Sequence, residues 1–326
     1  MEQNSVAVNN DLVNKKKSKK MVFEKMFSLL ALVLLSVILS ILSPYFLTTE
    51  NLLSIGLQTA IIAIIALGMV FVIISGGIDL SVGSIVALSG IITAQLLVAG
   101  VPLLITLIAG IAAGGVLGFV NGFIIAKGNL PPFIVTLGMM GVARGLSLVL
   151  TDGLPISSLP ESFTFLGNGR ILGIPVPVVI LIVVALIAAF VLSKMIFGRY
   201  VYSIGSNEEA AHLSGINVTF NKIMIYAICG LMSGLAGILM AARLVSAQPS
   251  AGTGYELDAI AAVVIGGASL AGGVGTVGGT IIGAFIMGVL RNGLNLLDVS
   301  PFWQQIAIGV IIVLAVYLDQ VRRKKK

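Results

Sequence analysis

Long apolar runs separated by short polar segments fill most of this chain. A helix needs roughly 20 apolar residues to cross the hydrocarbon core of a bilayer, and fewer where it packs inside a bundle. By this measure we expect ten membrane-spanning helices, of which the eighth is short. Their expected ranges are 26–46, 57–75, 82–100, 102–126, 132–150, 175–196, 222–242, 257–271, 275–293 and 302–319.

The basic residues cluster near the two ends of the chain. Because Lys and Arg that flank membrane spans stay in the cytoplasm, we expect residues 1–22 and residues 320–326 to be cytoplasmic tails. Two cytoplasmic termini require an even number of spans, which ten satisfies. The transmembrane domain then covers residues 23–319, and its cytoplasmic loop at residues 197–221 is the longest polar interruption.

The composition agrees with a multi-pass membrane protein. The chain is 58% hydrophobic and 10% charged, whereas about 25% of the residues of an average soluble domain are charged. The net charge of +6 arises from the basic clusters in the tails rather than from a folded face, so we expect no contact with nucleic acid. Binding of anionic membrane lipid by the tails is a secondary expectation.

Two glycine-rich segments resemble each other. Residues 76–83 and residues 266–273 share the pattern G-G-x-x-L-x-x-G. We expect helices to break at the paired glycines that open these segments, which are Gly76, Gly77, Gly266 and Gly267. The match suggests that spans two to five and spans seven to ten are related halves of inverted orientation, because inverted repeats with interrupted helices are typical of transporters.

A short polar helix is expected at residues 206–217, between the sixth and seventh apolar runs. Ser206 and Glu209 have the spacing of a capping box, and Gly215 can take the left-handed conformation that ends a helix. A helix of about two turns is too short to be stable alone in water. We therefore expect it to dock into a soluble partner.

The same segment carries the motif of a known family. Glu209-Ala210-Ala211-x-x-x-Gly215 has the E-A-A-x-x-x-G form of a cytoplasmic loop found in permease subunits of ABC importers. Residues 76–84 and 243–264, with the shorter stretches 213–218 and 292–297, closely resemble the ribose-type sugar permeases. The resemblance covers nearly the whole chain after the first tail. It implies an all-α, polytopic permease like those of type II ABC importers, in the cytoplasmic membrane of a prokaryote.

The resemblance also implies partners. The permease is expected to form a homodimer, or a heterodimer with a sister chain, and a separate cytoplasmic ATPase consumes MgATP. An extracytoplasmic sugar-binding protein is expected to deliver ribose; xylose, galactose or a furanose-like signalling molecule such as autoinducer-2 are alternatives. The chain has no Walker-type G-x-x-x-x-G-K-[ST] sequence. We expect no catalytic residue, cofactor or metal ligand in it, and a secondary transporter is the alternative from another class.

Coupling to the ATPase is assigned to the polar helix. The expected coupling residues are Glu208, Glu209, Ala210, Ala211, Leu213 and Gly215. The two alanines and the leucine are expected to enter a groove on the ATPase, as amphipathic helices do in other complexes. The two glutamates are expected to cap the helix and pair with basic residues on the rim of the groove. An ordinary solvated loop is the alternative.

Asp79 lies among apolar residues beside the first glycine pair. A carboxylate inside a membrane segment is by default a functional hypothesis. We favour a local role, in which Asp79 accepts hydrogen bonds from backbone amides freed where the helix breaks. A proton carrier in a secondary transporter is the alternative.

Two further groups of residues are candidates for function. Docking of the binding protein is assigned to three arginines on or near the extracytoplasmic side, which are Arg170, Arg243 and Arg291. Pairing of these arginines with acidic residues of this chain is the alternative. Weak contacts with sugar hydroxyls along the transport path are assigned to Asn121, Gln248, Asn292 and Asn295. For these four, hydrogen bonding to another helix is the alternative.

Overall fold

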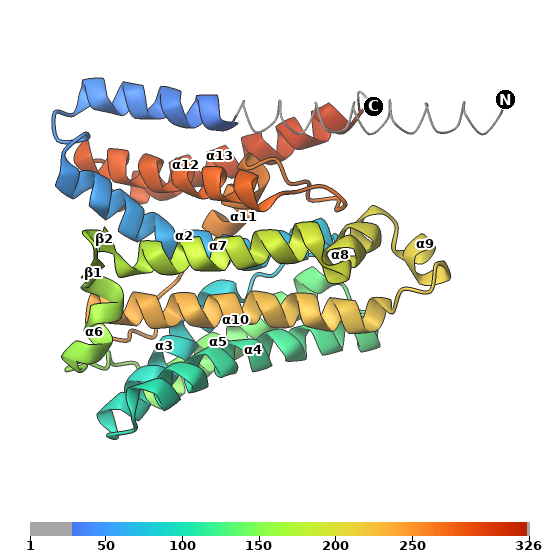
Figure 1. Cartoon of the computed structure of the whole chain (residues 1–326), viewed down its shortest axis with the longest axis horizontal. Helices are drawn as coiled ribbons and strands as arrows, with labels where there is room; N and C mark the ends of the chain where they lie inside the picture. Colours follow the sequence, from blue (N-terminus) through green and yellow to red (C-terminus); the bar gives the residue numbers. More distant parts are fainter. Residues whose placement is uncertain (1–27, 325–326) are drawn as a thin grey trace.

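A bundle of long helices makes up the fold (Figure 1). The computed structural model describes residues 28–324, and within them the only named strands form one short hairpin. The apolar helices are Ser28–Leu42, Thr49–Ile74 (α2), Val82–Val98 (α3), Leu103–Gly128 (α4), Pro132–Thr151 (α5), Val176–Lys194 (α7), Val218–Leu244 (α10), Tyr255–Ile265 (α11), Val277–Leu296 (α12) and Pro301–Lys324 (α13). The smaller elements are Glu161–Asn168 (α6), Arg170–Ile171 (β1), Ile174–Pro175 (β2), Ile196–Ser206 (α8) and Glu208–Leu213 (α9).

Ten apolar helices correspond to the ten expected spans, although they differ in length. Six of the described helices, α2, α4, α5, α7, α10 and α12, are long and apolar enough to cross a membrane. The helix at Ser28–Leu42, α3 and the apolar part of α13 are shorter. With 11 residues, α11 is only about 16 Å long at 1.5 Å per residue. The eighth span is expected to be short, and α11 is shorter still than its expected range of 257–271. A helix of this length covers about half of the hydrocarbon core.

The tails predicted at the two ends of the chain are only partly described. The tail at residues 1–22 lies outside the described residues. At the other end, α13 continues to Lys324. The helix therefore extends into the predicted tail at residues 320–326.

The long helices run between two ends of the molecule (Figure 1). We call the end that carries α9 the α9 end, and the end that carries β1 and β2 the hairpin end. Helix α10 joins them, since it begins shortly after α9 and its last carbonyl groups, at Ala242 and Arg243, accept hydrogen bonds from Asn168 beside the hairpin. Its 27 residues correspond to about 40 Å of helix.

Helix α2 lies in the middle of the bundle. In its most apolar stretch 89% of the residues are buried, against 28% for α4 and 22% for α5. Helices α4 and α5 therefore leave broad apolar faces uncovered. Side chains of α2 such as Ile64, Leu67 and Phe71 form the centre of the main hydrophobic cluster.

Glycines allow α4 and α10 to pack with their backbones in contact. A Cβ atom at Gly230 of α10 would overlap the carbonyl oxygen of Gly114 on α4, and one at Gly118 would overlap the carbonyl oxygen of Tyr226. Close approach through small residues is the usual way in which helices associate in lipid. Larger side chains at these positions would force the two helices apart.

Both glycine pairs break helices, as predicted. Helix α2 ends at Ile74, just before Gly76 with a φ of +84°, and α11 ends at Ile265, just before Gly267 with a φ of +92°. The two segments also meet, because the N–H of Gly273 donates to the carbonyl oxygen of Ile74. Helix α11 follows α10, which ends at the hairpin end, and α2 also begins at the hairpin end (Figure 1). Both helices therefore run from the hairpin end towards this contact, so the two matching segments follow helices of the same orientation. The match is no evidence for inverted halves.

Candidate functional site

The α9 helix is capped by a different residue from the one predicted. The side-chain oxygen of Asn207 accepts a hydrogen bond from the N–H of Ala210 at 2.9 Å. The hydroxyl of Ser206 instead donates to the carbonyl oxygen of Tyr202, in the last turn of α8. The predicted capping box of Ser206 and Glu209 is therefore wrong. The predicted helix end is confirmed, because Gly215 has a φ of +82°.

The side chains of α9 divide into an inner and an outer set. Ala211 is 4% exposed and packs against its own chain, so the prediction that it enters a groove on a partner is wrong. Ala210 is exposed, and Leu213 is 81% exposed. A leucine this exposed on a six-residue helix is the most prominent apolar contact that α9 offers to a partner.

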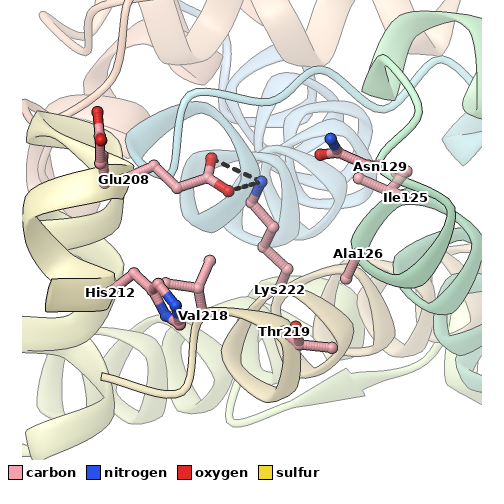
Figure 2. Close-up of a pocket in the computed structure, with 9 residues that line it drawn as sticks. Ile125, Ala126, Asn129, Glu208, His212, Val218, Thr219 and Lys222 are labelled. Atoms are coloured by element: carbon pink, nitrogen blue, oxygen red, sulfur yellow. Dashed lines mark hydrogen bonds and ion pairs between the residues drawn. The ribbon is translucent and has the colours of Figure 1, made fainter. Parts of the chain in front are cut away.

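An ion pair ties the first turn of α9 to the first turns of α10. The Nζ atom of Lys222 lies 2.6 and 2.7 Å from the two carboxylate oxygens of Glu208 (Figure 2). The Lys222 side chain is 17% exposed and that of Glu208 is 52% exposed. Glu208 therefore pairs within its own chain, which differs from the expected pairing with basic residues of a partner.

Two hollows flank α9. One, of about 430 Å³, lies between α9, α10 and the last turn of α4, and Glu209 and His212 are among the residues that line it. The two residues of the ion pair between α9 and α10 line the same hollow, and Figure 2 shows the pair there. The other, of about 400 Å³, lies between α8 and α9 and is lined by small polar side chains such as Ser203 and Ser214. Helix α9 is thus a ridge that a partner can enclose from both sides.

Helix α8 fastens this ridge to the glycine-rich segments. The Tyr202 hydroxyl donates to the carbonyl oxygen of Gly275 at 2.8 Å. Burial raises the pKa of Tyr202, so the hydroxyl stays protonated and remains a donor at neutral pH. Gly205 lies against the carbonyl of Ile74, where a Cβ atom would overlap it. A displacement of α8 and α9 would therefore also displace the C-terminal end of α2 and the segment before α12.

Comparison with known proteins gives a family. The family model described as "Branched-chain amino acid transport system / permease component" matches residues 51–316. The chain belongs to this permease family. It is a multi-pass membrane protein whose relatives are permease subunits of importers.

Curated relatives cover nearly the full length of the permease. The ribose import permease protein RbsC of Escherichia coli is 51% identical over 296 residues, which are 90% of this chain and 92% of the relative. Its namesake in Bacillus subtilis is 51% identical over 92% of this chain and 94% of the relative. The D-allose transport system permease protein AlsC of Escherichia coli is 41% identical over 93% of each chain. No solved structure matches this chain.

Asp79 of the permease lies in the non-helical segment between α2 and α3. Its Oδ1 atom accepts hydrogen bonds from the N–H of Ser81 at 2.9 Å and from the hydroxyl of Ser81 at 2.6 Å. The same hydroxyl accepts a hydrogen bond from the side-chain amide of Asn121 at 2.9 Å. The structure agrees with a local role for Asp79, with Ser81 supplying the backbone amide.

Two of the four residues assigned to the transport path are structural. Asn121 is fully buried, and Asn292 is 6% exposed and exchanges two amide hydrogen bonds with Asn51 at the start of α2. Their assignment to the path is wrong for this arrangement of the helices. Asn295 accepts a hydrogen bond from Gln304 of α13 but is exposed, and the partly exposed Gln248 lies in the loop after α10. Their assignment to the path stays a prediction.

The three arginines assigned to docking lie in different surroundings. Arg291 on α12 makes an ion pair with Asp258 on α11, with distances of 2.7 and 2.9 Å from Nη2 to the carboxylate oxygens. Asp258 is fully buried, so the alternative of pairing within the chain holds for Arg291. Arg243 is half-buried at the end of α10, and Arg170 is exposed on β1.

Two further residues organise these sites. Arg144 lies within a predicted span, where an arginine is expected to meet a carbonyl oxygen or to snorkel. It donates to the carbonyl oxygens of Pro249 and Ala251, and so holds the loop between α10 and α11. The sequence marks Lys222 only as a charge at the margin of a span. Its partner Glu208 is 14 residues away, and no local pattern joins the two.

Proposed function

We propose that this permease is the membrane-spanning subunit of an ATP-driven, binding-protein-dependent importer of ribose. The observation that carries the proposal is the 51% identity to ribose import permeases across 90% or more of the chain. Relatives for allose and arabinose are 39–41% identical. The higher identity therefore favours ribose over these two sugars. Xylose, galactose and a furanose-like signalling molecule are the other candidate substrates.

In the proposed assembly the α9 end faces the cytoplasm and the hairpin end faces outward. A separate ATPase, the partner that uses MgATP, encloses the ridge formed by α9 and contacts the exposed Leu213. Closure of the ATPase dimer pushes this ridge, and rigid-body movement of the helices alternates access. The movement of α9 is transmitted to the membrane helices by two sets of contacts. These are the contacts of α8 with Gly275 and Ile74, and the ion pair between α9 and α10.

We further propose that a second copy of the permease covers part of the open faces of α4 and α5. Three glycines of α5 have open space where a Cβ atom would lie, with no described atom of this chain within 4 Å; they are Gly138, Gly141 and Gly145. Small residues facing outward suit close packing of another helix. Other exposed side chains, such as Phe302 and Trp303 at the start of α13, have the aromatic character typical of the lipid interface.

Uptake by intact cells tests the substrate. A strain that lacks this chain is compared with the same strain carrying it on a plasmid, using radiolabelled ribose, allose, arabinose, xylose and galactose. The proposal predicts that ribose uptake alone is lost and that the plasmid restores it. Normal ribose uptake with loss of another sugar would overturn the substrate but keep the importer.

Substitution of Gly215 is expected to uncouple transport from ATP hydrolysis. Valine is strained at a φ of +82°, whereas asparagine tolerates the left-handed region. The Cβ position at Gly215 is open, so conformation rather than crowding decides the result. We expect Gly215→Val to lose most ribose uptake while still inserting in the membrane, and Gly215→Asn to keep it. Equal uptake by both variants would contradict the assignment of α9.

Charge reversal tests the ion pair between α9 and α10. Partly exposed pairs contribute about 0.2–1 kcal/mol, which corresponds to a change of about 1.4- to 5-fold in the population of correctly placed α9. Glu208→Lys and Lys222→Glu are each expected to lower the sugar moved per ATP by a factor in this range, and the double swap to restore it. If Glu208→Lys instead releases the ATPase on purification and the swap does not recover it, Glu208 contacts the partner.

A further inference from the structure

The hairpin of β1 and β2 has an unusual residue at its tip. Leu172 and Gly173 form the two-residue turn, with φ values of +51° and +82°. Positive φ at both positions is the mark of the type I′ turn, whose first position favours Asn, Asp or Gly. A leucine here is held in a left-handed conformation that its side chain disfavours.

Leu172 is also the most exposed of the large apolar residues among those that the structure describes. It is 98% exposed, and its neighbours Ile171 and Ile174 are 45% and 44% exposed. A strained backbone and a fully exposed apolar side chain are both unfavourable for the isolated chain. Their coincidence at one residue points to a contact made by the tip.

The hairpin is firmly mounted on the end of α10. The N–H of Val176 donates to the carbonyl oxygen of Gly169 at 3.0 Å, which closes the base of the hairpin. The side-chain amide of Asn168 donates to the carbonyl oxygens of Ala242 and Arg243 at 3.1 Å each. Leu172 is therefore a rigid knob at one end of the helix whose other end carries the ion pair to α9.

We propose that Leu172 is the apolar knob by which this permease docks the soluble sugar-binding protein, inserting into an apolar pocket on that partner. The inference rests on the proposed function, which places the hairpin end outside the membrane and supplies this partner. Lipid is the competing occupant, and the length of α7 opposes it. The 19 residues of α7 correspond to about 28 Å of helix and so cover the hydrocarbon core by themselves. The hairpin precedes α7 and therefore lies beyond the hydrocarbon core.

Substitution of Leu172 by asparagine gives a clean test. Asparagine suits this turn position better than leucine, so the fold is kept while the knob is lost. The permease–ATPase complex is placed in nanodiscs, and the dissociation constant of ribose-loaded binding protein is measured for wild type, Leu172→Asn and Leu172→Met. We expect the asparagine variant to raise the constant at least tenfold, and the methionine variant, which keeps an apolar knob, to stay within about twofold of wild type.

The thermal stability of the same samples separates the two occupants. The inference predicts that the melting temperature of Leu172→Asn is unchanged or higher. An unchanged dissociation constant overturns the inference, and if the melting temperature then falls, the tip contacts lipid. Failure of the proposed function has a different signature, since the binding protein would then fail to bind or to stimulate ATP hydrolysis in the wild-type complex.

Discussion

Replacement of Arg291 by leucine is expected to leave little folded permease. Asp258 is fully buried at the start of α11, and Arg291 is its ion-pair partner, with a side chain that is 32% exposed. Removing one member of a buried pair leaves an uncompensated charge, which typically costs about 3–5 kcal/mol. We therefore expect Arg291→Leu to give much less monodisperse protein in detergent and a lower melting temperature. Size-exclusion chromatography and thermal unfolding measure both.

A double variant is the control for this prediction. Replacing Asp258 and Arg291 together by leucine removes both charges, and substitution of a buried pair by apolar residues is often neutral or stabilising. We expect the double variant to recover most of the yield. A single Arg291→Leu variant as stable as wild type would show that Asp258 finds another partner or is not buried in the membrane.

Replacement of Gly230 by leucine is expected to separate α4 from α10. A side chain at Gly230 would meet the backbone of Gly114 and Gly118 rather than a movable side chain. Ordinary overpacking costs about 1–3 kcal/mol, and here neither backbone can yield locally, so we expect a cost at the upper end of this range or above. Because α10 joins the α9 end to the hairpin end, both stability and transport should fall.

Gly309 on α13 provides a matched control for the effect of leucine itself. It is a helical glycine with no described atom within 4 Å of its Cβ position. We expect Gly309→Leu to insert and melt like the wild type, and Gly230→Leu to melt lower or to be degraded. Equal behaviour of the two variants in a thermal-stability assay would contradict the close contact of α4 and α10.

Most of the fold could be predicted because hydropathy marks each membrane helix. Hydropathy fails for α11 because apolar residues continue past its end at Ile265 into the segment after Gly267, so the apolar run is longer than the helix. The breaks themselves are visible as glycine pairs. Their common orientation follows from the predicted order of spans, because the second and the eighth of ten alternating spans run in the same direction. The contact between Gly273 and Ile74, far apart along the chain, could not be predicted from the sequence.

The candidate site could be predicted as a segment but not residue by residue. Ser206 and Asn207 are both good caps, and the choice is made by α8, which continues through Ser206. Helix α9 has six residues, too few for periodicity to separate the buried Ala211 from the exposed Leu213. The partners Lys222 and Asp258 lie 14 and 33 positions from the charges they neutralise. Such pairings are set by the tertiary fold.

ATP-dependent uptake by a purified system tests the central claim most directly. The permease is reconstituted in liposomes with its ATPase on the ATP-containing side and ribose-loaded binding protein on the other, and radiolabelled ribose is measured inside the compartment that holds ATP. The account predicts uptake that requires the permease, ATP and the binding protein together, and that Gly215→Val abolishes while Gly215→Asn preserves it. Ribose uptake by the permease alone, driven by an ion gradient and indifferent to ATP, would contradict it and establish a secondary transporter.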